Sequence, residues 1–224
     1  MGLEICVLYE DSDIILCIKP SGILSQKDRG ESMVSVLSSR CGSEIYPLHR
    51  LDKEVSGVMV YAKNKKAAAF LSREISERRM KKEYIALVHG RPEKERGEMC
   101  DLLFKDSSKN KSYVVKRMRK GVKDARLEYE VLNTQGEADN AVSKVRILLH
   151  TGRTHQIRVQ FSSRQMPLVG DRRYGARDGA EVLCLWSHRL TFTHPKTKKT
   201  MTFSFEPNTD LGSLAEKERE NVYE

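Results

Sequence analysis

Short apolar runs separated by turn residues constrain the fold of this chain more than any other feature. Apolar residues recur at every second position over 127–131, 145–149 and 201–205, which predicts strands with one buried face. Other short apolar runs, one of them closed by a Pro-Ser-Gly turn, extend the predicted strands to Ile5–Tyr9, Asp13–Lys19, Gly57–Ala62 and Tyr84–Val88. The chain should therefore contain many short strands.

Helical spacing is confined to a few stretches. Met33–Cys41 and Lys65–Arg79 carry apolar residues about one helical turn apart, which predicts two helices. Gly152–Ser163 is ambiguous, because its apolar residues satisfy both the helical and the strand period. Since the helices do not alternate regularly with strands, we expect an α+β fold with a mainly antiparallel sheet. No linker divides the sequence, so a single domain over residues 1–224 is predicted, with a polar, frayed tail from Gly212.

Charge points to a polyanionic partner. The formal net charge is +9, and nucleic acid is the usual partner of such a protein, although a basic protein without one is the plain alternative. Lys105–Arg126 holds nine Lys and Arg against two Asp. This one-signed excess favours an arm that contacts a nucleic-acid backbone over a merely solvated hairpin tip.

The cysteines and the apolar runs indicate the compartment. Five cysteines lie far apart without a CxxC pair, as expected for small buried residues of a reduced protein rather than disulfides or a zinc site. The start of the sequence has no signal-peptide pattern, and no apolar run is long enough to span a bilayer. We therefore expect a cytoplasmic protein without a membrane segment.

The segment His49-Arg50-Leu51-Asp52, followed by Ser56-Gly57, places a carboxylate in a polar turn between two apolar runs. Such a carboxylate can stay ionised near neutral pH and serve as a nucleophile or general base. The alternative is an aspartate that only caps the turn. The tetrapeptide by itself does not decide between them.

Three further motifs occur with this segment. They are SDIILCIKPSGIL (Ser12–Leu24), KKEYIALVHG (Lys81–Gly90), and HTGRTHQIRVQF (His150–Phe161) running on to PLVGDRRYG (Pro167–Gly175). With HRLDKEVSG they resemble the RluA family of pseudouridine synthases, whose pattern is HRLDxxTSG, KxYxAxVxG, then GRTHQIR followed by PLxGDxxYG. The match runs from about Ser12 to Phe205 in the order of the family.

The resemblance implies an isomerase that converts uridine to pseudouridine within RNA. It implies the catalytic fold of that family: a mixed sheet with flanking helices and basic loops around a central cleft. The substrate would be a ribosomal RNA stem-loop or transfer RNA, and neither a metal nor another cofactor is needed. No additional S4-type module precedes the first motif, which suggests a compact form of the enzyme, and a monomer is the simplest expectation.

The resemblance implies a role for each residue of this sequence that matches a site residue of the family. Asp52 stands where the family has its catalytic aspartate, which acts on C1′ or on the base. Tyr84 matches the active-site tyrosine, which can stack on the base near the C5 proton; the alternative is a core tyrosine with a capped hydroxyl. Arg158 matches the arginine that pairs with the aspartate and keeps it ionised; the alternative is an exposed helical arginine. Arg50 would fill the space left by the flipped nucleotide.

Other residues are expected to bind RNA or support the pocket. For His49 and His155 we favour structural hydrogen bonds over proton transfer. The candidates of this kind are four residues of the GRTHQIR motif, His155 among them, and four cations of the basic stretch: Arg153, Thr154, His155 and Gln156, with Lys116, Arg117, Arg119 and Lys120.

One position departs from the family, since Val55 replaces the usual Thr, and we expect the turn to keep its geometry. Two other functions remain open. One is a catalytically silent RNA-binding protein on the same scaffold. The other is a hydrolase with paired carboxylates, which would release free base.

Overall fold

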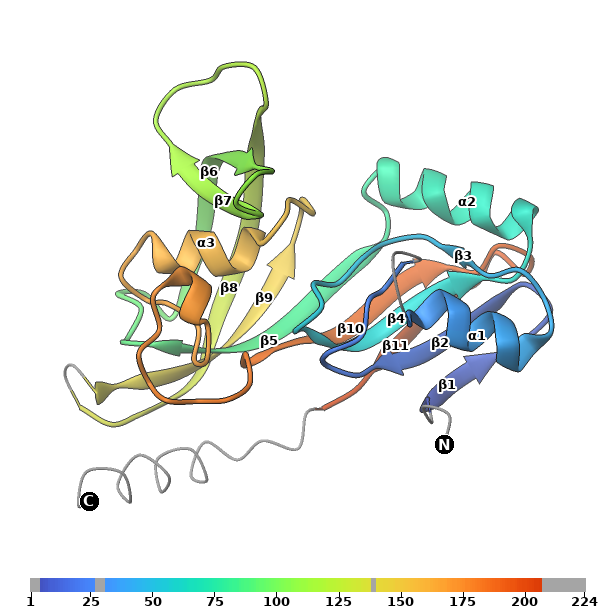
Figure 1. Ribbon diagram of the computed structural model, residues 1–224, viewed down its shortest axis with the longest axis horizontal. Helices are drawn as coiled ribbons and strands as arrows, with labels where there is room; N and C mark the ends of the chain where they lie inside the picture. The colour runs from blue at the N-terminus through green and yellow to red at the C-terminus, as the bar shows by residue number, and fades with distance from the viewer. Residues whose placement is uncertain (1–4, 27–30, 138–139, 207–224) are drawn as a thin grey trace. The chain divides into compact units, whose positions relative to one another are not determined.

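The computed structural model describes residues 5–26, 31–137 and 140–206 (Figure 1). These form two compact units: the first comprises the described residues up to Glu83 together with Trp186–Glu206, and the second comprises Tyr84–Leu185. Strand β5 (Lys81–His89) carries the chain from the first unit into the second, and β10 (Leu185–Thr193) carries it back. Within these residues no helix is both long and apolar enough to cross a membrane.

The first unit is built on a mixed sheet with the strand order β1-β2-β4-β10-β11. Its pairs are antiparallel except β4 with β10, which is parallel, so the expected mixed, mainly antiparallel sheet is confirmed. A two-residue strand, β3, pairs antiparallel with β4 at Tyr61 and Ala62. The strand bounds are β1 (Val7–Glu10), β2 (Ile14–Lys19), β3 (Tyr46–Pro47), β4 (Ser56–Ala62) and β11 (Thr200–Ser204).

Two helices accompany this sheet. Helix α1 (Met33–Cys41) has the predicted bounds, because Ser32 and Ser35 form a reciprocal capping box at its start and Gly42 adopts a left-handed conformation after its end. Helix α2 (Lys65–Ser76) ends three residues before the predicted boundary at Arg79. Arg78 has φ of +58°, which no right-handed helix accommodates.

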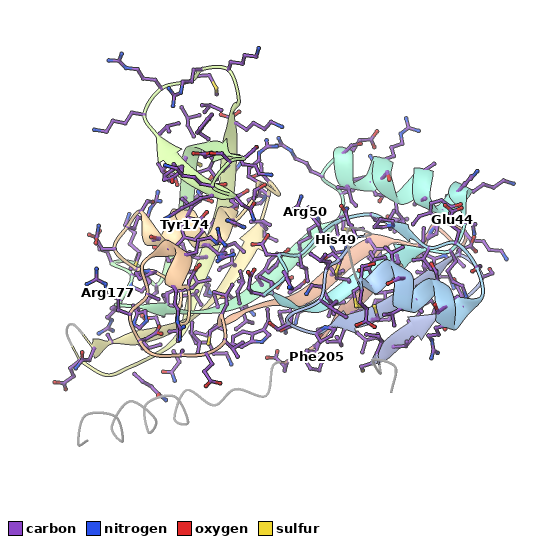
Figure 2. All side chains as sticks on the ribbon, in the orientation of Figure 1. Glu44, His49, Arg50, Tyr174, Arg177 and Phe205 are labelled. Atoms are coloured by element: carbon purple, nitrogen blue, oxygen red, sulfur yellow. The ribbon has the colours of Figure 1, made fainter. Side chains whose placement is uncertain are left out.

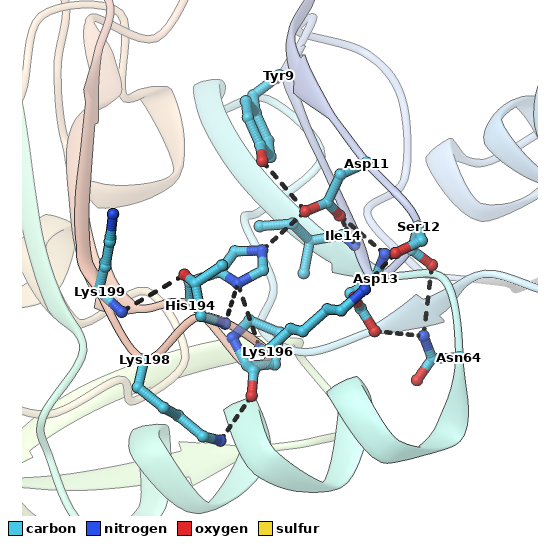
Figure 3. Close-up of polar contacts among 12 residues, drawn as sticks. Tyr9, Asp11, Ser12, Asp13, Ile14, Asn64, His194, Lys196, Lys198 and Lys199 are labelled. Atoms are coloured by element: carbon cyan, nitrogen blue, oxygen red, sulfur yellow. Dashed lines mark hydrogen bonds and ion pairs between the residues drawn. The ribbon is translucent and has the colours of Figure 1, made fainter.

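The turn between β10 and β11 is organised by His194, whose side chain is buried (Figure 3). Its Nε2 lies 2.8 Å from a carboxylate oxygen of Asp11, which also accepts the hydroxyl of Tyr9. Its Nδ1 accepts the backbone N–H groups of Lys196 and Thr197 at 3.2 and 3.0 Å. One imidazole therefore joins this turn to the segment between β1 and β2.

In the second unit the strand order is β5-β9-β8-β6-β7, and β9 with β8, β8 with β6, and β6 with β7 pair antiparallel. The long strands β6 and β8 project with β7 as a hairpin arm, coloured green in Figure 1. Helix α3 (Gln156–Ser162) and a 3-10 turn, η2 (Arg172–Tyr174), complete the unit. The bounds of the strands are β6 (Arg96–Asp106), β7 (Lys111–Val115), β8 (Val122–Gln135) and β9 (Val142–Leu149).

Several expectations need comment. Cys17 and Cys184 are buried as predicted, but Cys6 and Cys100 are exposed and Cys41 is partly exposed, so the expectation of five buried cysteines is wrong. Cys6 directly precedes β1, which is an edge strand of the sheet. The predicted polar tail lies outside the described residues, and the single domain stays a prediction.

Candidate active site

Asp52 lies in a tight turn directly before β4. The Val55 N–H donates to the Asp52 carbonyl at 3.1 Å and closes this turn. On the preceding side, the Ser25 hydroxyl donates to the Leu51 carbonyl at 2.8 Å and accepts the Leu51 N–H at 3.0 Å. The side chain of Val55 is buried, so the methyl group that replaces the family's hydroxyl faces the core. The backbone that carries the Asp52 carboxylate is thus held on both sides.

Lys19, at the end of β2, supports the same turn from the interior. Its side chain has no exposed surface, and its Nζ donates to the carbonyl oxygens of Pro20 at 2.7 Å and Lys53 at 3.1 Å. Burial lowers the pKa of Lys19 from 10.5 to about 8, although the negative charges of Glu54 and Asp52 oppose this shift. A cation beside the Asp52 turn is therefore retained at neutral pH.

Gly57 fixes the position of β4 against β10. It has φ of +121°, and an added Cβ would lie 2.3 Å from the carbonyl oxygen of Ser187. Only glycine fits both the conformation and this close approach of two backbones. The glycine that follows the Asp52 turn in the sequence is thus a packing requirement of the sheet.

His49 and Arg50 take different environments although they are neighbours; both are labelled in Figure 2. His49 is buried, and its Nε2 accepts the Val60 N–H at 3.3 Å. Burial, followed by the positive charge of Lys82, lowers the pKa of His49 to about 3, so the ring stays neutral. This agrees with the structural role expected for His49. Arg50 is exposed, as a side chain that entered RNA would need to be.

Tyr84 lies in β5, at the start of the second unit, and is 6% exposed. Lys82, two residues earlier, has its pKa lowered by burial. Because Asp52 belongs to the first unit and Tyr84 and Arg158 to the second, the pairing of Asp52 with Arg158 stays a prediction.

Arg158 is buried in α3, which excludes the alternative of an exposed helical arginine. Its Nε donates to Oδ2 of Asp171 at 2.7 Å and its Nη2 to Oδ1 at 2.8 Å. The guanidinium also lies over the ring of Tyr174, with Cζ 5.3 Å from the ring centroid. Asp171 and Tyr174 both belong to the PLVGDRRYG motif.

Tyr174 joins α3 to β7 through its hydroxyl. This group accepts the Ser112 N–H at 2.8 Å and lies 2.9 Å from Nδ1 of His155. The Ser112 hydroxyl in turn donates to the carbonyl of Thr154 at 2.7 Å. His155 thus makes a hydrogen bond within the protein, while its structural role in place of proton transfer stays a prediction.

Gln156 and Arg153 tie the start of α3 to β8. The side-chain oxygen of Gln156 accepts from the hydroxyl of Thr151 at 2.7 Å and from the Arg153 N–H at 3.1 Å, and its amide donates to the Arg126 carbonyl at 3.2 Å. The Nε of Arg153 donates to the carbonyl of Asp124 at 2.8 Å. These contacts give the motif a supporting role within the protein, while binding of RNA by its residues stays a prediction.

The four cations of the basic stretch, Lys116, Arg117, Arg119 and Lys120, are exposed in the loop between β7 and β8. Arg119 lies over the ring of Phe104 at 5.1 Å. Most of the remaining residues of Lys105–Arg126 belong to β6, β7 and β8, with a turn over residues 107–110. In the described part of the chain no group of three or more His, Cys, Asp or Glu side chains could hold a metal ion.

The sequence reading missed Lys19 and Asp171 as members of the site. Both stand inside the family motifs, Lys19 before Pro-Ser-Gly and Asp171 after Gly170. The available signal was a charged residue at the end of an apolar run, where a buried charge needs partners.

Comparison with known proteins places this geometry in a family. The family model described as RNA pseudouridylate synthase matches residues 13–163. The dual-specificity RNA pseudouridine synthase RluA of Escherichia coli (strain K12) is 38% identical over 204 residues, covering 88% of this chain and 90% of that protein. An uncharacterized RNA pseudouridine synthase of Aquifex aeolicus is 35% identical over 226 residues, covering 92% of this chain and 70% of that protein.

Among solved structures, human RNA pseudouridylate synthase domain containing 1 has the same fold. It superposes with a TM-score of 0.76 at 24% identity, covering 96% of this chain and 95% of that one. Human RNA pseudouridylate synthase domain containing 4 gives a TM-score of 0.75 at 20% identity, covering 96% and 93%. The extent of these matches, together with the motifs in their order, shows that this chain belongs to the RluA family of RNA pseudouridine synthases, which are isomerases acting on RNA.

Proposed function

We propose that this protein converts specific uridines in large-subunit ribosomal RNA to pseudouridine, with transfer RNA as a second class of substrate. The names of its relatives support this choice. One relative is called dual-specificity, and a relative in Borreliella burgdorferi, 34% identical over 205 residues, is called ribosomal large subunit pseudouridine synthase D. A monomer in the cytoplasm is the state that the sequence predicts for it.

The observation that carries the proposal is the fixed backbone around Asp52. A carboxylate that must meet one carbon of a nucleotide has to be held within a fraction of an ångström. Ser25 and Lys19 hold the residues on either side of Asp52, and the Val55 N–H closes the turn. An aspartate that only capped a turn would not need a buried lysine for support.

In the proposed reaction Asp52 acts at C1′, or on the base, while the bond between C1′ and N1 breaks. Uracil turns in place, C5 joins C1′, the proton on C5 leaves and N1 takes up a proton, so no atom is gained or lost overall. Tyr84 stacks on the base and lies near that proton, and Arg158 pairs with the Asp52 carboxylate. Arg50 fills the gap left by the flipped nucleotide and offsets part of the cost of unstacking.

The decisive test is Asp52→Asn. Ribosomal and transfer RNA fractions from cells that lack the protein are incubated with wild type or variant, and pseudouridine is mapped by mass spectrometry. Wild type should convert uridine at defined positions, whereas Asp52→Asn should convert none and bind RNA within a few-fold of wild-type affinity, because a single oxygen is replaced. Asp13→Asn, which changes another turn aspartate of the first unit, should convert at the wild-type rate.

Other outcomes identify the alternatives. Binding without conversion by the wild type would support the silent RNA-binding protein. Free uracil among the products would support a hydrolase. Equal loss of affinity and activity in Asp52→Asn would indicate misfolding of the turn.

A further inference from the structure

We propose that Asp171 is a positioning residue for Arg158 in pseudouridine formation. This inference rests on the proposed role of Arg158 as the partner of the catalytic aspartate. Asp171 is not among the residues to which the family resemblance gave a role. The side chains of this pair are 4% and 0% exposed, and both lie within the second unit.

The contact between the two side chains fixes a direction as well as a charge. Asp171 binds the edge of the guanidinium formed by Nε and Nη2, at 2.7 and 2.8 Å. A two-point contact prevents rotation about the terminal bonds of the arginine, which a single hydrogen bond would allow. The edge formed by Nη1 and Nη2 then points away from Asp171, and we assign to this edge the contact with the Asp52 carboxylate.

A second constraint comes from Tyr174, whose ring lies under the guanidinium plane. The hydroxyl of Tyr174 is itself held by the Ser112 N–H and by His155. Asp171 thus sets the edge of the guanidinium, and the Tyr174 ring lies against the same group. Together they leave Arg158 little freedom to follow a misplaced carboxylate.

Asp171 is anchored by its own backbone. Its N–H donates to the Leu168 carbonyl at 3.0 Å, and its carbonyl accepts the N–H groups of Tyr174 and Ala176 at 3.0 and 3.1 Å. Gly170, just before it, has φ of +76°, and an added Cβ would lie 2.1 Å from the Val182 carbonyl oxygen. The carboxylate therefore projects from a rigid turn, as a positioning residue requires.

A purely structural explanation competes with this proposal. A buried guanidinium needs a counter-charge whether or not it takes part in chemistry, and Asp171 supplies one. The two explanations differ in how changes at the two positions combine. A positioning residue acts through Arg158, so its effect on the chemical step should disappear once Arg158 can no longer act.

The test is a double-mutant cycle with Arg158→Lys, Asp171→Asn and the combined variant. Single-turnover rates and RNA affinities are measured on a ribosomal RNA fragment that the wild type modifies. Asp171→Asn should lower the rate of the chemical step about 100-fold, as expected for a misplaced catalytic group, and leave RNA affinity nearly unchanged. The combined variant should be no slower than Arg158→Lys alone.

Asp101→Asn is a matched control, because Asp101 pairs with Arg164 near the end of the same helix at 2.9 Å. It should leave the rate at the wild-type value. Circular dichroism melting establishes that each variant is folded at the assay temperature. If Asp171→Asn does not fold, Asp171→Glu keeps the charge but moves it by one methylene, and its rate should fall between those of wild type and Arg158→Lys.

The outcomes separate this inference from the proposed function. The positioning role would be overturned if the combined variant lost rate by the product of the two single losses. A wild-type rate for Asp171→Asn or Asp171→Glu would overturn it too. Either result would leave the role of Asp52 intact. An active Asp52→Asn enzyme would overturn the proposed mechanism itself, and the positioning role with it.

Discussion

Lys19 shows how a single buried charge shapes the site. Its ammonium group donates to two backbone carbonyls instead of pairing directly with a carboxylate, so burial costs more than the contacts return and its pKa falls to about 8. Such a group lowers the stability of the fold while it holds the turn that carries Asp52. Arg158 is likewise a buried charge held in a fixed position, but it pairs directly with a carboxylate, that of Asp171.

This shift makes stability depend on pH. Between about pH 8 and 10.5 the unfolded chain keeps a proton on Lys19 that the folded chain has released, so the free energy of unfolding should rise with pH. A shift of this size corresponds to about 3 kcal/mol, present above the unfolded pKa and lost as pH falls to 8. Lys19→Met should remove that rise, as measured by urea denaturation at pH 7.5, 9 and 10. Parallel curves for the two proteins would show that Lys19 is not the titrating group.

At the scale of elements, the parallel pair of β4 and β10 depends on one glycine. The backbones meet at Gly57 and Ser187, in register, and no side chain fits between them. Because the Asp52 turn leads directly into β4, this close approach also fixes the position of the backbone that carries the Asp52 carboxylate. The glycine of the motif thus allows β4 to pack against β10, and this packing in turn places the Asp52 turn.

Gly57→Ala should lower the free energy of unfolding by about 2–5 kcal/mol, since it combines a positive φ with a steric clash. Gly42→Ala is the control, because Gly42 also has a positive φ, +61°, but nothing lies within 4 Å of its added Cβ. This change should cost only about 1–2 kcal/mol. Chemical denaturation of both variants gives the comparison. Equal losses would mean that the contact with Ser187 relaxes and only the backbone conformation matters.

For the whole molecule, the proposed RNA contact of the loop between β7 and β8 can be measured through salt. Replacing its four cations with Ala should weaken RNA binding and flatten the log–log salt dependence by about 0.7 per lost phosphate contact. A control variant removes the same charge from the first unit through four exposed lysines: Lys65, Lys66, Lys196 and Lys199. A larger change in the control than in the loop variant would place the contact with the RNA backbone elsewhere.

Some elements were predictable because their signals lie within the local sequence. Helix α1 has an apolar stripe, a serine cap and a glycine stop, and the strands β2 and β4 are short apolar runs closed by turns. Helix α3 was ambiguous because six of its seven residues are buried, so no polar face reveals its period. Strand β10 was overlooked for a similar reason, since its first four residues are all buried.

The sequence by itself determined the family and the reaction and predicts which carboxylate acts, because these depend on residue types at fixed spacing along the chain. Tertiary structure alone decided that Lys19 lies buried beside the Asp52 turn and that Arg158 is held by Asp171 thirteen residues away. The physical reason is that burial and pairing of charges arise only when distant segments meet. A motif identifies the residues, but only tertiary packing determines which group each charged side chain contacts.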